Sequence, residues 1–261
     1  VALNPKTGEV LAMVSKPTYD PNDLKSAISA ANSGGAANSP LINRATNGLY
    51  PPGSTFKVVT ATSALENIPD VLSRTFDDSK GYIQISEKYS LYNDSGSANG
   101  YVDLKNAFLA SSNVVFGGIL ARELGSETLK ETAEKFGFNK DIPKEGFGLA
   151  QSKFPLETYP GVIAQSGIGQ GSILATPMQM ALVAATIAND GEYITPTFYT
   201  KVTDSQDKVI LEPKQEKNRV FSEENSYILK QLLTEPLNAG GTATNCKIPK
   251  METSAKTGTT N

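Results

Sequence analysis

The residues of this 261-residue chain that could perform nucleophilic chemistry are serines placed three positions before a lysine. A serine hydroxyl is a weak nucleophile until a base removes its proton. The chain contains no histidine, which excludes the Ser-His-Asp and Cys-His mechanisms and leaves lysine, a carboxylate or tyrosine as the base. On a helix, residues three apart face the same side, and burial or a neighbouring cation lowers the pKa of a lysine towards neutrality.

The Ser-x-x-Lys spacing occurs twice, at Ser54…Lys57 and at Ser205…Lys208. Pro52-Gly53 precedes the first pair and marks the start of a helix, whose N-terminal N–H groups and dipole favour a developing oxyanion. The second pair lies in a polar stretch that reads as a solvated turn. The spacing alone therefore leaves two interpretations of Ser54, a nucleophile with Lys57 as its base or an ordinary helix start.

Two further triplets carry useful side chains and are also duplicated. The Ser-x-Asn pattern occurs in a Gly/Ser/Asn-rich loop at Ser97-Ala98-Asn99, which reads as plain surface, and between two helical segments at Ser111-Ser112-Asn113. The second copy is either a turn with an N-cap or a hydroxyl and an amide that face a cleft.

The Lys-Thr-Gly pattern occurs in the opening turn, at Lys6-Thr7-Gly8, and near the end of the sequence, at Lys256-Thr257-Gly258. The later copy lies in a strand-like run over 253–260. Glycine inside a strand often marks a place where a ligand comes close, and a cation beside a hydroxyl suits a substrate carboxylate. An edge strand with a bulge is the alternative.

Apolar periodicity and turn residues predict the elements that must position these groups. The predicted elements are hairpins over 1–14 and 199–211 and helices over 54–68, 104–124, 127–136, 176–189 and 223–234. Residues 20–50 read as irregular surface, 76–100 as loops or a small hairpin, and 137–175 as loop-rich. Strands at both ends with helices between them predict an α+β layout in which the termini pair in one sheet.

Composition excludes several classes of function. The net charge is −3 and the lysines are scattered, which argues against a nucleic-acid surface. The single cysteine, Cys246, allows no intrachain disulfide and no Cys/His metal site, and we expect a part-buried residue or an inert thiol there. The longest mostly apolar run, Met178 to Ala188, is shorter than the about 20 residues that span a bilayer.

The three triplets occur in the order found in penicillin-binding proteins and related β-lactamases. The chain resembles the transpeptidase domain of monofunctional, class B penicillin-binding proteins almost from end to end. The segments that carry this resemblance are Val1–Asn22, Asn43–Lys57, Ile168–Ala181, Gly241-Thr242-Ala243 and Ala255–Thr259.

The resemblance implies the penicilloyl-serine transferase fold, with an antiparallel sheet flanked by helices and a helical subdomain. It implies a D,D-transpeptidase that acts on peptidoglycan stem peptides ending in D-Ala-D-Ala and is acylated by β-lactams, with no cofactor and no metal.

The roles that the resemblance implies fall on the residues of the three triplets. By position, Ser54 is the nucleophile and Lys57 the base. Ser111 relays a proton and Asn113 holds the substrate amide. Lys256 keeps the field positive, and Thr257 and Gly258 lie at the substrate carboxylate. The backbone N–H groups of Ser54 and Thr259 form the oxyanion hole.

The resemblance also implies a membrane anchor and pedestal upstream, two further strands and a helix after Asn261, and a place on the outer face of the bacterial cytoplasmic membrane beside a glycan polymerase. A D,D-carboxypeptidase has the same site. A β-lactamase or β-lactam sensor is less favoured, because no Glu-x-x-Leu-Asn pattern follows Ser111. A non-catalytic scaffold is the alternative from another class.

Overall fold

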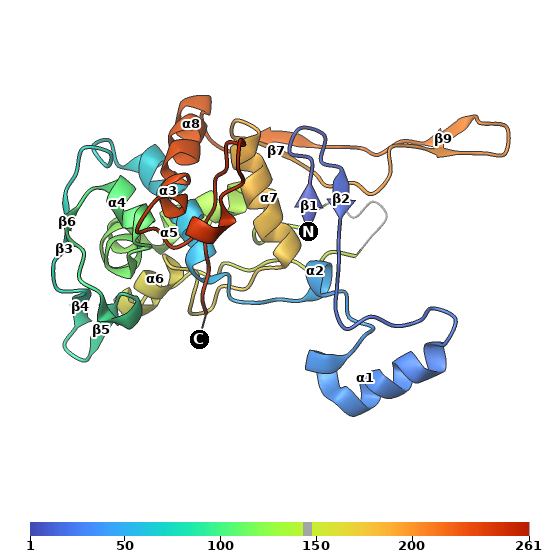
Figure 1. Ribbon diagram of the computed structural model, residues 1–261, viewed down its shortest axis with the longest axis horizontal. Helices are drawn as coiled ribbons and strands as arrows, with labels where there is room; N and C mark the ends of the chain where they lie inside the picture. Colours follow the sequence, from blue (N-terminus) through green and yellow to red (C-terminus); the bar gives the residue numbers. More distant parts are fainter. Residues whose placement is uncertain (143–147, 261) are drawn as a thin grey trace.

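The computed structural model describes residues 1–142 and 148–260, apart from the side chains of residues 36 and 37 (Figure 1). The α-helices are α1 (Leu24–Asn38), α2 (Arg44–Asn47), α3 (Lys57–Asn67), α4 (Leu104–Leu109), α5 (Arg122–Lys135), α6 (Pro160–Ser166), α7 (Pro177–Ala188) and α8 (Glu223–Leu232). A π-helix, η3 (Val114–Ala121), connects α4 to α5. The 3-10 turns are η1 (Gly53–Phe56), η2 (Asp94–Gly96), η4 (Glu235–Leu237) and η5 (Thr244–Cys246).

The strands of the described chain are short and form five two-stranded antiparallel sheets. The pairs are β1 (Ala2–Leu3) with β2 (Val10–Ala12), β3 (Phe76–Asp78) with β6 (Gly100–Val102), β4 (Tyr82–Ser86) with β5 (Tyr89–Tyr92), β7 (Glu192–Ile194) with β10 (Lys217–Arg219), and β8 (Val202–Thr203) with β9 (Val209–Leu211). The predicted hairpins over 1–14 and 199–211 are therefore confirmed.

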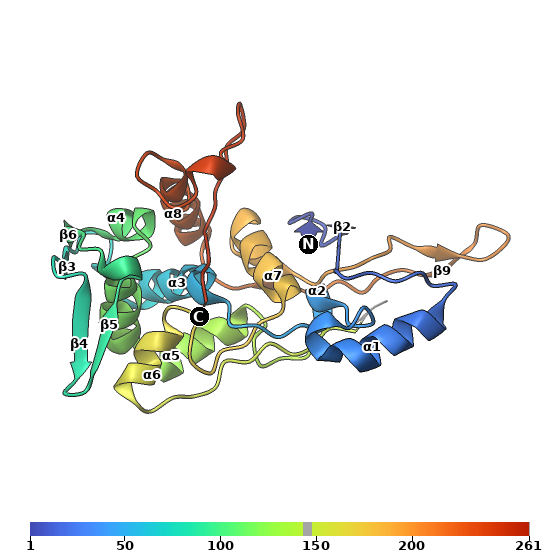
Figure 2. The same ribbon diagram turned by 60° about the horizontal axis from the view of Figure 1, so that its bottom comes forward.

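Helix α3 is the centre of the core. In both views it lies between α8 and α5 (Figures 1 and 2), and it packs against both and against η3. Every residue from Lys57 to Ala64 is buried. Just before the helix, the Phe56 ring stacks on Phe154 and meets Phe138 edge-on, each with ring centroids 5.6 Å apart. Helix α3, which begins at Lys57, is therefore surrounded by α5, α8 and η3 and fixed by its packing against them.

Two further predicted helices begin where their capping residues indicate. Thr176 accepts a hydrogen bond from the Gln179 amide and Pro177 is the first residue of α7. Ser222 caps α8 in the same way through the Asn225 amide. Side-chain caps satisfy N–H groups that have no partner within the helix, and such a cap stabilises the start of each of these two helices.

The prediction of irregular structure over 20–50 is wrong at α1. The Ser and Asn residues that suggested loops are outweighed by alanines, which have the highest helix propensity. The helix buries little and contains a kink at Gly35, with φ 64°, and it projects from the body in Figure 2. Helix α6 likewise lies inside the stretch predicted to be loop-rich, of which residues 143–147 are outside the described residues.

The expected sheet between the two termini is not formed in the described chain. Strands β1 and β2 pair with each other, and Glu9 makes a parallel bridge to Thr197. Residues 253–260 are extended but belong to no strand, because their neighbours are helix and turn residues: the Ala255 amide donates to the Leu233 carbonyl just after α8. The mixture of helices and strands is as predicted, and the pairing at the C-terminal segment is not.

Candidate active site

Ser54 lies in η1, which leads directly into α3 at Lys57. The preceding residue, Gly53, is buried with φ 55°, a region that residues with a Cβ rarely adopt. A Cβ on Gly53 would lie 2.4 Å from the Thr259 carbonyl oxygen. The tight turn before Ser54 and the close approach of the C-terminal segment therefore both require glycine.

The glycine cluster of 167–171 supports the same turn. The Gly53 amide donates to the Gly169 carbonyl at 2.9 Å, and Gly169 has φ 71°. A Cβ on Gly169 would lie 2.2 Å from the Gly53 carbonyl oxygen. The backbone that presents Ser54 is thus packed against a second backbone turn.

The ammonium group of Lys57 lies in a closed polar environment, and the residue is 0% exposed. Its Nζ is 2.6 Å from the Ser111 carbonyl oxygen, 2.7 Å from Asn113 Oδ1 and 3.2 Å from Ser111 Oγ. Burial, and secondly the charge of Lys256, hold the pKa of Lys57 well below its ordinary value, while Asp94 and Asp78 partly oppose this shift. A lysine with so low a pKa can be neutral and act as a base.

Lys256 reaches the same serine from the opposite end of the chain. Its Nζ donates to Ser111 Oγ at 2.8 Å and to the Thr257 carbonyl at 3.0 Å. Burial lowers the pKa of Lys256 to about 8, so most of the side chain is cationic at neutral pH. Next to it, the Thr257 hydroxyl donates to Thr242 Oγ1 at 2.8 Å.

The structure thus brings Lys57, Ser111, Asn113 and Lys256 into one hydrogen-bonded cluster. Ser111 has φ 53°, a strained value for a residue with a Cβ. The Ser54 hydroxyl, which is half-buried, has no hydrogen-bond partner among residues 1–142 and 148–260.

The segment with Gly258 and Thr259 lies against the serine turn. A Cβ on Gly258 would lie 2.9 Å from the Thr55 methyl group, and the Thr259 carbonyl faces Gly53. The two residues that are expected to form the oxyanion hole, Ser54 and Thr259, therefore belong to backbone segments in close contact.

The duplicate motifs differ in their surroundings. Ser205 and Lys208 are exposed at the tip of the β8–β9 hairpin, where Asp204 accepts from the backbone. Thr7 is exposed in the β1–β2 turn, which contains Gly8 at φ 69°. The interpretation of Ser205…Lys208 and of Lys6-Thr7-Gly8 as turn residues is therefore confirmed.

The interpretation of Ser97-Ala98-Asn99 as plain surface is wrong for Asn99. Its side-chain amide donates to Asp78 Oδ2 at 2.6 Å. Asp78 is 1% exposed and lies beneath the Ser111-Ser112-Asn113 triplet, where Ser112 Oγ donates to it at 2.7 Å. Sequence reasoning missed Asp78, although strand alternation places it on the same face as the buried Phe76.

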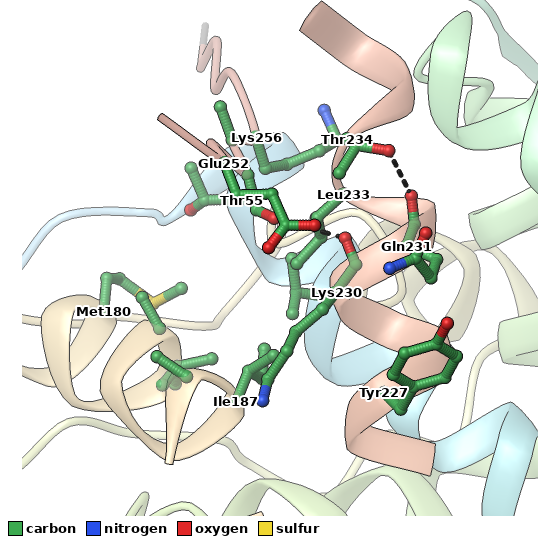
Figure 3. Close-up of a pocket in the computed structure, with 16 residues that line it drawn as sticks. Thr55, Met180, Ile187, Tyr227, Lys230, Gln231, Leu233, Thr234, Glu252 and Lys256 are labelled. Carbon is green, nitrogen blue, oxygen red and sulfur yellow. Dashed lines mark hydrogen bonds between the residues drawn. The ribbon is translucent and has the colours of Figure 1, made fainter. Parts of the chain in front are cut away.

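A separate cavity of about 750 Å³ borders this cluster between α7, α8 and the C-terminal segment (Figure 3). Met180 and Ile187 line it from α7 and Tyr227 from α8, and Thr55 and Lys256 form its boundary with the site. Ser54, Lys57 and Ser111 are not among its lining residues. Of the hydrogen-bonded cluster, Lys256 alone is among the lining residues, so the cavity adjoins the candidate site and does not contain it.

Three further features of the described residues bear on function: metal-binding clusters, membrane-spanning helices and the single thiol. No group of three or more His, Cys, Asp or Glu side chains among them could hold a metal ion. No helix there combines the length and the apolar character that crossing a membrane requires. Cys246 is exposed, so the first of the two expectations for it, a part-buried residue, is wrong.

Comparison with known proteins places the whole chain in one family. Residues 1–261 match the model of the penicillin binding protein transpeptidase domain. The peptidoglycan D,D-transpeptidase PbpA of Mycolicibacterium smegmatis is 38% identical over 205 residues, which are 75% of this chain and 41% of that protein. MrdA of Acinetobacter baumannii, also named a peptidoglycan D,D-transpeptidase, is 33% identical over 213 residues, 75% of this chain and 31% of that protein.

Solved structures similar to this chain come from the same family as these relatives. The D,D-transpeptidase domain of a peptidoglycan glycosyltransferase from Eggerthella lenta has a TM-score of 0.90 at 32% identity, covering 99% of this chain and 65% of that one. The imipenem acyl-enzyme of penicillin-binding protein A from M. tuberculosis has a TM-score of 0.88 at 29% identity, covering 98% and 60%.

The chain belongs to the penicillin-binding protein transpeptidase family, and its relatives are the monofunctional, class B members. The expected penicilloyl-serine transferase fold is confirmed. The chain spans less than half the length of the curated relatives it matches.

Proposed function

We propose that this chain is the acylating part of a peptidoglycan D,D-transpeptidase, with Ser54 as its nucleophile. The observation that carries the proposal is the Ser111 hydroxyl, which lies 3.2 Å from Lys57 Nζ and 2.8 Å from Lys256 Nζ. It connects a buried amine that can be neutral with one that is mostly cationic, and Lys57 begins the helix that directly follows the Ser54 turn.

In the proposed acylation, Ser54 Oγ attacks the carbonyl carbon of the penultimate D-Ala while its proton moves to neutral Lys57. The bond from that carbon to the nitrogen of the terminal D-Ala breaks, and the leaving nitrogen takes a proton through Ser111. An amine of a neighbouring stem peptide then attacks the Ser54 ester and returns the proton to Ser54. No oxidant, metal or cofactor is needed for this exchange of acyl groups.

Substrate binding falls to the remaining residues of the three triplets. Asn113 binds the substrate amide, and Lys256 with Thr257 and Gly258 binds the terminal carboxylate. The backbone N–H groups of Ser54 and Thr259 bind the oxyanion, where such donors contribute about 10²–10³ in rate. The contact of Gly258 and Thr259 with the serine turn supports these roles.

The same chemistry makes β-lactams acylating inhibitors, as the acyl-enzyme structures of penicillin-binding protein A from M. tuberculosis illustrate for that protein. A lactamase activity is less favoured, because hydrolysis needs a base for water. Within the described residues, the hydrogen-bond partners of Lys57 and Lys256 are serine, asparagine and threonine oxygens and no carboxylate.

From the resemblance to class B penicillin-binding proteins, we infer that the whole protein is anchored at the outer face of the bacterial cytoplasmic membrane and acts with a glycan polymerase. Reconstitution of the full-length protein with such a polymerase tests this part. Cross-linked product that forms equally without the polymerase would contradict the pairing.

A fluorescent penicillin tests the acylating serine. We expect stable covalent labelling of the protein, detected by intact mass and gel fluorescence, that is lost in Ser54→Ala and retained in the matched variant Ser205→Ala. Absence of label on folded wild-type protein contradicts the proposal and favours a non-catalytic scaffold. Rapid release of the label favours a lactamase.

A stem pentapeptide separates transfer from hydrolysis. Release of D-Ala together with a cross-linked product in the presence of an acceptor amine supports the transpeptidase. Release of D-Ala with only the shortened peptide, whatever amine is added, favours the D,D-carboxypeptidase.

A further inference from the structure

A buried carboxylate that none of the three motifs contains lies beneath the candidate active site. Asp78 is the last residue of β3, pairs with Gly100 of β6 and is 1% exposed. Buried carboxylates are rare unless they are paired or fully hydrogen-bonded. Its position therefore needs an explanation beyond the packing of a two-stranded sheet.

The Asp78 carboxylate accepts three hydrogen bonds from neutral side chains. Oδ1 accepts from Asn93 Nδ2 at 2.8 Å, and Oδ2 accepts from Asn99 Nδ2 at 2.6 Å and from Ser112 Oγ at 2.7 Å. The donors come from the loop before β6 and from the start of η3. One carboxylate thus connects the segment over 79–99, which contains β4 and β5, to the Ser111-Ser112-Asn113 triplet.

Two of these donor residues also accept hydrogen bonds from backbone N–H groups at the start of η3. Asn93 Oδ1 accepts from the amides of Asn113 at 2.8 Å and Val114 at 3.0 Å. Ser112 Oγ accepts from the Val115 amide at 3.0 Å. Three successive N–H groups that a helix start leaves without partners are therefore satisfied by side chains that Asp78 orients.

This capped backbone carries the groups that contact Lys57. Ser111, immediately before it, has φ 53°, a conformation that persists only where the surroundings impose it. The Ser111 carbonyl and Asn113 Oδ1 are the two nearest acceptors of Lys57 Nζ. Asn113 Nδ2 also donates to the Tyr92 carbonyl, beside Asn93.

We propose that Asp78 is a positioning residue for acylation, because its carboxylate fixes Asn93 and Ser112 and thereby holds Ser111 and Asn113 against Lys57. This inference rests on the proposed function of Ser54. Asp78 touches neither substrate nor Lys57 Nζ, so its effect on the reaction passes through the backbone of the triplet and through its charge.

Because the charge of Asp78 acts on the pKa of Lys57, its removal should shift the pH dependence of acylation. A purely structural role would not produce this shift. The charged groups that act on Lys57 are Lys256, which lowers its pKa, and Asp94 and Asp78, which raise it. The variant Asp78→Asn keeps the size of the side chain and removes the charge. The pKa of Lys57 then falls further, so the acidic limb of the acylation rate shifts to lower pH.

The experiment measures fluorescent-penicillin acylation against pH for wild type, Asp78→Asn and the matched control Asp77→Asn, whose exposed side chain lies on the other face of the same strand. We expect the maximal rate of Asp78→Asn to fall by about 10²-fold, the size typical of a misplaced catalytic group, with the acidic limb displaced to lower pH. Asp77→Asn should keep the wild-type rate and profile.

Amide hydrogen exchange of Asn113, Val114 and Val115 tests the positioning without using activity. We expect faster exchange at these three amides in Asp78→Asn and in Ser112→Ala, while amides within α7 stay protected. If Asp78→Asn does not fold, Ser112→Ala, which removes one donor and one acceptor, carries the test and should lose acylation by about 10-fold or more.

A folded Asp78→Asn or Ser112→Ala with the wild-type acylation rate and unchanged exchange overturns the inference. A slower rate with an unshifted acidic limb and unchanged exchange also overturns it. An unlabelled wild-type protein contradicts the proposed function instead, and the exchange data then still decide the role of Asp78 in holding the triplet.

Discussion

The Lys256 ammonium donates a 2.8 Å hydrogen bond to the Ser111 hydroxyl, although 145 residues separate the two in sequence. On the other side of that hydroxyl, Lys57 Nζ is 3.2 Å away. Burial lowers the pKa of both amines, and that of Lys57 is lowered further by Lys256. The hydroxyl therefore lies between a proton acceptor and a proton donor.

The acylation rate should depend on pH in a bell shape. It rises with pH as Lys57 loses its proton and becomes a base, at a pH well below 10.5, the ordinary pKa of lysine. It falls as Lys256 loses its charge, with a midpoint near pH 8, because the pKa of Lys256 is lowered to about 8. Stopped-flow labelling with a penicillin across pH measures both limbs, whose apparent midpoints belong to the coupled pair.

The variant Lys256→Arg identifies the alkaline limb. Arginine stays protonated to pH values of about 12, so the fall near pH 8 should disappear while the acidic limb remains. An alkaline limb that stays near pH 8 in this variant contradicts the assignment to Lys256. Lys208→Arg, at the exposed tip of the β8–β9 hairpin, is the control and should leave both limbs in place.

Replacement of Ser111 should separate stability from activity. Both Ser111→Gly and Ser111→Ala remove the hydroxyl that joins the two lysines, and both should lower the acylation rate by about 10²-fold or more. Glycine alone relieves the strain of φ 53°, worth about 1 kcal/mol. The Tm of Ser111→Gly should therefore exceed that of Ser111→Ala by about 2–4 °C.

Calorimetry on the two variants measures this difference directly. Equal melting temperatures, or a higher one for the alanine variant, would show that the surroundings of Ser111 do not impose strain. An acylation rate within a few-fold of wild type in either variant would remove Ser111 from the proton path.

The sequence indicated which residues lie together at the candidate site better than it indicated how the strands pair. Lys57 and Ser54 could be placed because a local feature, the Pro52-Gly53 helix entry, controls their geometry. The meeting of Lys256 with Ser111 depends on the resemblance to a family, since no local rule brings together residues so far apart. The absence of a strand over residues 253–260 could not be predicted, because a strand needs a neighbour that local sequence does not specify.

The buried network around Asp78 shows a different limit of sequence reasoning. Two adjacent aspartates in a polar stretch look alike in sequence, yet Asp77 is exposed and Asp78 is buried. Strand alternation separates them only once the strand is known. Asn93 and Asn99, in a loop rich in similar residues, carry no signal that distinguishes them from surface residues.

The hydroxyl of Thr242 should affect affinity more than rate. It accepts from Thr257 at 2.8 Å and so orients the hydroxyl proposed to bind the substrate carboxylate. Thr242→Val removes this acceptor at an exposed position, with little expected change in Tm. The loss of one neutral hydrogen bond, about 0.5–1.5 kcal/mol, should weaken penicillin binding before acylation by about 2–10-fold.

Saturation kinetics of labelling separate the two effects, since the half-saturating penicillin concentration should rise while the maximal rate changes little. Thr244→Val, two residues further along and also exposed, is the matched control and should leave both values unchanged. A fall in the maximal rate alone would place Thr242 in the chemical step instead.

Gly53 should tolerate no side chain. A comparison with Gly125 separates the cost of the steric contact at Gly53 from the cost of backbone strain. Gly53 and Gly125 both have positive φ, 55° and 76°, and Gly125 also has ψ 166°, so alanine costs about 1–3 kcal/mol at either position from backbone strain alone. At Gly125 a Cβ meets nothing within 4 Å, whereas at Gly53 it would lie 2.4 Å from the Thr259 carbonyl oxygen. Gly53→Ala must therefore also push the Lys256-Thr257-Gly258 segment away from Ser54.

Thermal melting and penicillin labelling of the two variants test this difference. Gly125→Ala should lower the Tm by about 2–4 °C per kcal/mol of strain and keep wild-type labelling. Gly53→Ala should lower the Tm further and reduce labelling by about 10²-fold, because a shift of about 1 Å at the oxyanion site costs that much. If Gly53→Ala melts like Gly125→Ala and labels like wild type, the C-terminal segment does not lie against the serine turn in solution.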